Sequence, residues 1–96
     1  MKVLHMTLKK KWFDMIKSGI KKEEYREMKQ YWHTRLLSRE YDVIRFKNGY
    51  GSDSPEFDIE FKRLESGLGI SEWGAPDYPV YIIKLGKILS SNNKAI

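Results

Sequence analysis

The clearest pattern of apolar and polar residues lies in the second half of the chain. Residues 57–64 alternate, with Phe57, Ile59 and Phe61 on one face and charged residues between them. This period of two is typical of a β-strand with one buried face. Residues 80–85 form a nearly continuous apolar run, which predicts a central strand, and Gly86 predicts a β-bulge before the strand continues to residue 89.

The first half of the chain alternates short strands with helices. Apolar residues recur at spacings of three and four over residues 9–18, which predicts an amphipathic helix with Thr7 as its N-cap. A second helix is predicted over residues 28–38, where Tyr31 and Trp32 are interleaved with Arg35. Such a face suits either stacking on nucleic-acid bases or packing in the core. The predicted strands of this half are residues 3–8, 22–26 and 41–47.

Two polar segments separate the later strands. Residues 48–53 begin with Asn-Gly, which is a strong signal for a hairpin turn. Residues 67–79 form a loop rich in Gly and Pro, and loops of this length are usually functional or disordered. Because a large aromatic residue such as Trp73 argues against disorder, we expect residues 72–76 to fold over a cleft near Lys21.

This order of elements predicts an α+β fold: a small antiparallel β-barrel of five to six strands, closed or mostly closed, with two flanking α-helices. The predicted domain covers residues 1–90, and the polar residues 91–96 are expected to fray. The predicted inward-facing residues are Ile16, Ile44, Phe46, Ile59, Phe61, Ile82 and Leu85.

Composition narrows the class of protein and of site. Ninety-six residues suffice for one domain with one core. There is no cysteine, and His5 and His33 lie far apart and away from acidic clusters, so no disulfide, metal or cofactor is expected. Without a membrane-length apolar run or the apolar core of a signal peptide, the protein is expected to be cytoplasmic. The net charge of +5, carried mostly by residues 1–50, favours an anionic partner or simply a basic soluble protein.

Residues 19–26, which join the first helix to the second strand, carry the candidate chemistry. Glycine at a helix C-terminus adopts the left-handed conformation without a Cβ penalty, so Gly19 predicts a sharp turn. Glu24 and Arg26 share one face of a strand, and Lys21 joins them only if the turn is irregular. The three can bind phosphate, carbonyl and amine groups, or Lys21 can act as a base with Glu24 as a proton shuttle. The alternative is an edge strand whose Glu–Arg pair lies in solvent.

The same segment resembles a known family. Gly19, Lys21, Glu24 and Arg26 match the G-x-K-x-x-E-x-R signature of the ASCH domain, a PUA-like β-barrel family, and residues 4–19 and 41–46 are similar to its neighbouring elements. The resemblance implies a PUA-like fold, a cleft lined by Lys21, Glu24 and Arg26, and a nucleic-acid or nucleoside ligand. Some ASCH-like proteins are amidohydrolases that deacetylate acetylated cytidine. Their nucleophilic threonine stands where this chain has Glu24, so the chain departs from that mechanism.

Three functions follow from these observations. The first is a small RNA-binding module that holds RNA or a modified nucleotide against Lys21, Glu24 and Arg26, with Glu72 and Trp73 as further ligand contacts. The second is a small amidohydrolase that acts on an acylated nucleoside such as acetylated cytidine, with Lys21 and Glu24 as catalytic residues. The third is a protein-interaction domain without a ligand. The sequence leaves the oligomeric state open.

Overall fold

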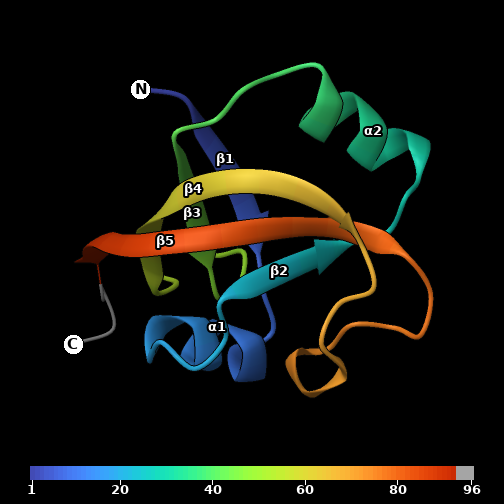
Figure 1. Ribbon diagram of the computed structural model, residues 1–96. Helices are drawn as coiled ribbons and strands as arrows, with labels where there is room; N and C mark the ends of the chain where they lie inside the picture. The colour runs from blue at the N-terminus through green and yellow to red at the C-terminus, as the bar shows by residue number, and fades with distance from the viewer. Residues whose placement is uncertain (93–96) are drawn as a thin grey trace.

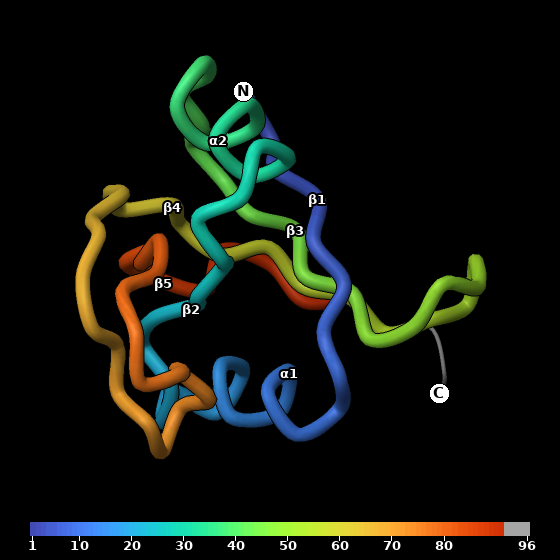
Figure 2. The backbone as a smooth tube through the Cα atoms, turned by 90° about the vertical axis from the view of Figure 1, so that its right-hand side faces the viewer, coloured from blue at the N-terminus to red at the C-terminus, as the bar shows by residue number. Residues whose placement is uncertain are grey.

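A computed structural model describes residues 1–92 as a curled five-stranded sheet with two α-helices (Figure 1). The helices pack at opposite ends of the curl (Figure 2). Neither of them has the length and apolar character needed to span a membrane. In chain order the elements are β1 (Val3–Thr7), α1 (Lys10–Lys17), β2 (Glu23–Arg26), α2 (Gln30–Leu37), β3 (Val43–Lys47), β4 (Glu56–Gly67), the 3-10 helix η1 (Ser71–Trp73) and β5 (Val80–Asn92).

The strands lie in the order β1-β3-β4-β5-β2. The α+β class, the five strands and the two helices agree with the prediction, and β3, β4 and β5 pair antiparallel as expected. The prediction of a wholly antiparallel, mostly closed barrel is wrong, because β1 pairs parallel with β3 and the sheet is mixed. The chain between them, α1-β2-α2, is the long crossover that a parallel pair requires. Within residues 1–92, β1 and β2 form the two edges and do not pair, so the sheet is a half-barrel.

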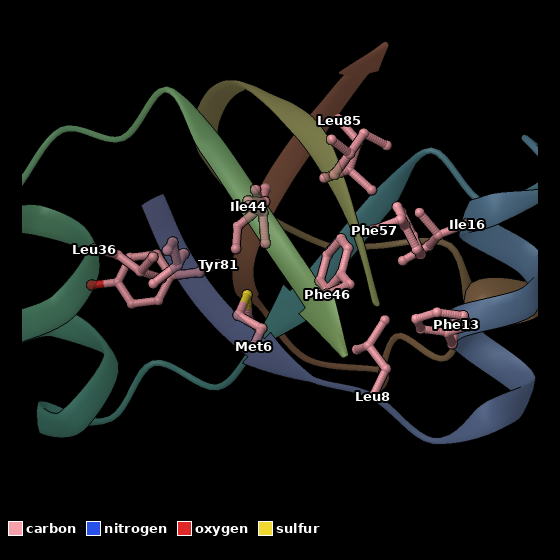
Figure 3. Close-up of a cluster of buried hydrophobic side chains, with 13 residues drawn as sticks. Met6, Leu8, Phe13, Ile16, Leu36, Ile44, Phe46, Phe57, Tyr81 and Leu85 are labelled. Carbon is pink, nitrogen blue, oxygen red and sulfur yellow. The ribbon is translucent and has the colours of Figure 1, made fainter. Parts of the chain in front are cut away.

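The main core fills the inside of this curl (Figure 3). Phe13 and Ile16 from the apolar stripe of α1 pack at one end, where the Phe13 ring lies edge-on to Phe57 at 4.9 Å. Leu36 of α2 packs at the other end, beside Tyr81. Burying a phenylalanine or leucine side chain stabilises a fold by about 1.5–3 kcal/mol, so these few contacts fix both helices on the sheet.

Two of the predicted inward positions are not buried in the main core. Phe61 is only partly buried and packs against Tyr41 at the margin of the core, because register shifts in β4 break the strict alternation between Asp58 and Arg63. Ile82 is buried on the other face of β5, in a second cluster with Tyr25 and Val80. The other five, Ile16, Ile44, Phe46, Ile59 and Leu85, lie in the main core as predicted.

Asp58 was expected to face solvent but is buried. It lies directly opposite Arg45 in the β3–β4 pair, and the Nε and Nη2 atoms of Arg45 donate to its two carboxylate oxygens at 2.7 and 2.8 Å. The arginine therefore covers the carboxylate on the face of the sheet away from the main core. Hydrogen bonds from Arg45 hold the pKa of Asp58 below its usual value.

Several element boundaries differ from the prediction. Thr7 is not an N-cap: it ends β1, the next residue still bonds to β3 through Lys47 O, and α1 begins after Lys9 with no side-chain cap. The bulge predicted at Gly86 is confirmed. Leu85 pairs with Phe61 and Ile88 pairs with Ile59, so β5 has one more residue than β4 between these two pairs. β5 then runs to Asn92, so residues 91–92 of the predicted frayed tail belong to the strand, and residues 93–96 lie outside the described part of the chain.

Candidate functional site

The turn after α1 positions Lys21. Gly19 has a φ of 86°, in the left-handed region that favours glycine. The backbone N–H groups of Ile20 and Lys21 both donate to Met15 O at 3.0 Å, which winds the chain tightly around the helix end. This irregular turn, required by the prediction, brings the Nζ atom of Lys21 to 3.2 Å from the Oε1 atom of Glu24.

Lys21, Glu24 and Arg26 form one connected network. The Nη1 atom of Arg26 donates to Oε2 of Glu24 at 2.9 Å, and the backbone N–H of Tyr25 donates to Oε1 at 3.0 Å. The exposed fraction of the side chain rises from 1% for Lys21 through 6% for Glu24 to 20% for Arg26. The alternative of a Glu–Arg pair lying in solvent is therefore wrong. The carboxylate is buried, with its two cationic partners on either side.

The Lys21 ammonium lies in an aromatic enclosure. It is 4.8 Å from the ring centroid of Trp12 and 4.8 Å from that of Tyr25, and it donates to the backbone carbonyl oxygen of Trp73. Ring faces attract cations electrostatically, so both aromatic residues help to hold the charge. Burial nevertheless lowers the pKa of Lys21, and the nearby Glu24 carboxylate offsets this only in part.

Tyr25 ties the long loop to β2. Its hydroxyl donates to Oε1 of Glu23 at 2.8 Å and accepts from the backbone N–H of Ile70 at 3.0 Å. Burial, aided by the bond to Glu23, raises the pKa of the Tyr25 phenol. Burial opposes ionisation of Glu23 too, but hydrogen bonds from Lys84 and Tyr25 outweigh it and lower the pKa of that carboxyl. The floor of the site is thus fixed from β2, from β5 and from the loop.

A cleft of about 250 Å³ opens above this network, where the half-barrel fails to close. One wall comes from the end of β1 and the start of α1, and the other comes from β2 and the loop. The two edge strands of the sheet therefore face each other across the cleft. The lining residues are Thr7, Leu8, Lys9, Trp12, Lys21, Glu24, Tyr25, Arg26, Trp73 and Gly74.

Four of the five predicted site residues lie at the cleft, and Glu72 does not. The structure brings Lys21, Glu24 and Arg26 together, and the expectation that Trp73 lies near Lys21 is confirmed. Trp73 reaches the lysine through its backbone carbonyl, while its ring packs against the second cluster of β5. Glu72 is exposed and does not line the cleft.

Sequence reasoning missed two aromatic walls of the cleft, Trp12 and Tyr25. Trp12 belongs to the apolar stripe of α1, which gave no sign of contact with a ligand, yet it is only partly buried and lines the cleft. Tyr25 alternates with Glu24 and Arg26 along β2, and this position gave no sign that its ring would cover Lys21. Within residues 1–92, no three His, Cys, Asp or Glu side chains cluster as metal ligands.

Comparison with known proteins adds no relative. Searches against protein-family models, curated proteins and solved structures gave no match for this chain. The cleft and the short motif that lines it are therefore the features from which a function can be inferred.

Proposed function

We propose that this protein is an ASCH-like, PUA-like module that binds RNA by holding one base or modified nucleotide in the cleft. The observation that carries the proposal is a buried carboxylate, Glu24, fixed between two cations at the floor of an open cleft. A buried charge is costly to maintain unless its partners are well placed. Recognition of a ligand gives a reason to keep the charge there.

The network leaves hydrogen-bonding capacity for a base. Oε2 of Glu24 accepts one bond, from Arg26, and a carboxylate oxygen has room for two. It can therefore accept from an exocyclic amine such as N4 of cytosine or N6 of adenine. Nη1 of Arg26 is used twice, by Glu24 and by Tyr25 O. Its Nε and Nη2 groups have no partner within residues 1–92 and can donate to a base carbonyl or a phosphate.

The shape of the cleft supports a small occupant. Its volume of about 250 Å³ lies just below the range of about 300–1,000 Å³ for pockets that hold drug-sized ligands. Trp12, whose ring has the Lys21 and Lys11 ammoniums 4.8 and 4.7 Å from its centroid, adds an aromatic wall to the cleft. Lys9 at the mouth and a net charge of +5 favour the attached phosphates.

The test is the affinity for a short single-stranded RNA at several salt concentrations. Arg26→Ala should weaken binding and reduce the slope of log affinity against log salt by about 0.7, the value for one lost phosphate contact on a single strand. Lys21→Met should weaken binding without changing that slope, because a side chain that is 1% exposed does not reach a phosphate. Glu24→Gln should alter the preference among bases more than the overall affinity.

Two controls belong with these variants. Glu27→Gln removes a carboxylate from an exposed pair with Lys29 just after β2, and Lys87→Ala removes an exposed lysine that does not line the cleft. Both should bind RNA like the wild type. If the wild type binds no RNA, or if the controls lose as much affinity as the cleft variants, the proposal is wrong and a protein-interaction domain becomes the better hypothesis.

One observation favours the amidohydrolase as a second candidate. The pKa of Lys21 is lowered and its ammonium lies 3.2 Å from Glu24, an arrangement that suits a general base and a proton shuttle. Neutral Lys21 would take a proton from water as the water attacks the acetyl carbonyl of acetylated cytidine. The Glu24 carboxylate would relay that proton from Lys21 to the departing amine, so that the products are acetate and cytidine. Chromatography of acetylated cytidine incubated with the protein tests this. Steady turnover that disappears in Glu24→Gln supports the hydrolase over the binding module.

A further inference from the structure

A row of four side chains, two aromatic rings between two guanidinium groups, leads out of the cleft along α2. Arg26, which lines the cleft, holds its guanidinium 5.2 Å from the ring centroid of Trp32. Trp32 meets Tyr31 edge-on at 4.9 Å. Tyr31 in turn lies under the guanidinium of Arg35, at 4.5 Å. Each group thus contacts the next, from the cleft to the outer surface of the helix.

This row ends in a second groove. The groove has a volume of about 470 Å³, and no carboxylate lines it; its lining residues are Gln30, Tyr31, Thr34, Arg35 and Arg39. Neither arginine forms an ion pair within residues 1–92. Tyr31 is 58% exposed, although it is a large aromatic residue. Helix spacing alone explains a Tyr–Arg contact at i, i+4, but it does not explain the acid-free groove beside that contact or the side-chain contacts that link Tyr31 through Trp32 to Arg26 in the cleft.

The helix presents this surface rigidly. Leu36 is buried in the main core, and the ring of His33 packs edge-on to Tyr81 and hydrogen-bonds to its hydroxyl. The hydroxyl of Tyr41 also donates to the carbonyl of Arg35 at 2.7 Å, which holds the last turn of the helix. The outward face of α2 therefore keeps a fixed position relative to the cleft.

We infer that α2 is a second nucleic-acid contact, and that the protein binds a single strand running from the cleft over Arg26 and Trp32 to the groove at Tyr31 and Arg35. This inference rests on the proposed function of the cleft and extends it from one nucleotide to a strand. Tyr31 supplies a stacking surface for a base, and Arg35 supplies a cation for the adjoining phosphate. Single-strand sites that combine aromatic stacking with a positive groove span about 4–16 nucleotides, so the expected site holds at least about four.

The experiment compares a mononucleotide with a labelled hexanucleotide, followed by tryptophan quenching and by fluorescence anisotropy respectively. Tyr31→Ala should weaken hexanucleotide binding by at least about fivefold, the effect of losing one stacked base, and should leave mononucleotide binding unchanged. Tyr31→Phe keeps the ring and should bind the hexanucleotide like the wild type. Arg35→Lys keeps the charge but loses the planar stack, so it should fall between wild type and Arg35→Ala. Lys87→Ala is the control for loss of a positive charge elsewhere.

The outcomes separate this inference from the proposal on which it rests. If Arg26→Ala impairs both ligands while Tyr31→Ala impairs neither, the cleft binds a nucleotide and the α2 contact is wrong. If Tyr31→Ala impairs both ligands equally, the effect is on the fold and the inference is also overturned. If neither ligand binds the wild type, both proposals fail. A deoxy hexanucleotide in parallel shows whether the strand must be RNA, since a loss of affinity there indicates contact with the 2′-hydroxyls.

Discussion

Replacing Glu24 by glutamine leaves the Lys21 ammonium buried without its ion-pair partner. The side chains of the pair are 1% and 6% exposed, so solvent screens the interaction little. Removing one partner of such a pair costs about 3–5 kcal/mol, a large share of the roughly 5–15 kcal/mol that stabilises a typical domain. For a domain of this size, each kcal/mol lowers Tm by about 4–8 °C. We therefore expect Glu24→Gln to lower Tm by more than about 10 °C at pH 7.

The loss should shrink as pH rises. Burial holds the pKa of folded Lys21 below its ordinary value of 10.5, and Glu24 partly restores it. Between the folded and the unfolded pKa, the unfolded chain binds more protons than the folded chain, so stability increases with pH in that window. Without Glu24 the folded pKa falls further and the window opens at lower pH. The difference in unfolding free energy between wild type and Glu24→Gln should consequently be smaller at pH 9 than at pH 7.

Urea unfolding followed by circular dichroism at the two pH values measures both effects. Glu27→Gln is the matched control, because its pair with Lys29 is exposed on both sides and exposed pairs contribute only about 0–1 kcal/mol. The double variant Lys21→Met/Glu24→Gln removes both charges and should recover at least half of the loss. A loss below about 1 kcal/mol in Glu24→Gln, or a loss independent of pH, would show that the ammonium is not held as a buried charge.

Three further predictions concern the core, the loop and acid stability. Phe46→Ala should lower the free energy of unfolding in urea by about 3–5 kcal/mol, because Phe46 is fully buried. Phe61→Ala should lower it clearly less, because Phe61 is partly buried. Equal losses would contradict this difference in burial. Gly69→Ala would place a Cβ 2.5 Å from the Tyr25 ring, so a loss of about 1–3 kcal/mol and a shift in tryptophan emission are expected. The pKa of Asp58 in the folded protein lies below its ordinary value of 3.8. Asp58 therefore stabilises the fold at pH values above 3.8, and this stabilisation is lost as the pH falls through the folded pKa. Asp58→Asn should consequently flatten the decline in Tm at acid pH.

Local patterns predicted the elements because each pattern depends on neighbouring residues. The period of two in residues 57–64 lies within β4, and the apolar run at residues 80–85 lies within β5. The parallel pairing of β1 with β3 depends instead on residues far apart in the chain, and no local pattern encodes its direction. The register shifts between β4 and β5 likewise arise from the fit between two long strands rather than from the alternation of either one, so the partial burial of Phe61 at the margin of the core could not be predicted.

The part of the site that depends on local backbone conformation could be predicted from the sequence. Gly19 signalled the turn that brings Lys21 to Glu24, and the spacing of Glu24 and Arg26 placed both on one face. The burial of the lysine between the rings of Trp12 and Tyr25 could not be predicted. This burial depends on how α1 and β2 pack together. In a sequence, an aromatic residue at helical or strand spacing indicates a core position rather than contact with a lysine.

The position of β2 in the sheet has a consequence for the order in which the molecule forms and opens. Glu23 pairs with Lys84, 61 residues later, whereas β3, β4 and β5 join neighbours in sequence. Closing a long loop costs entropy before its contacts form, so the three-strand meander should assemble first and β2 should dock last. By the same logic, β2 can detach without unfolding the meander, and this local opening dismantles the cleft. A ligand that binds there should therefore slow amide hydrogen exchange in β2 before it slows exchange in the central strands.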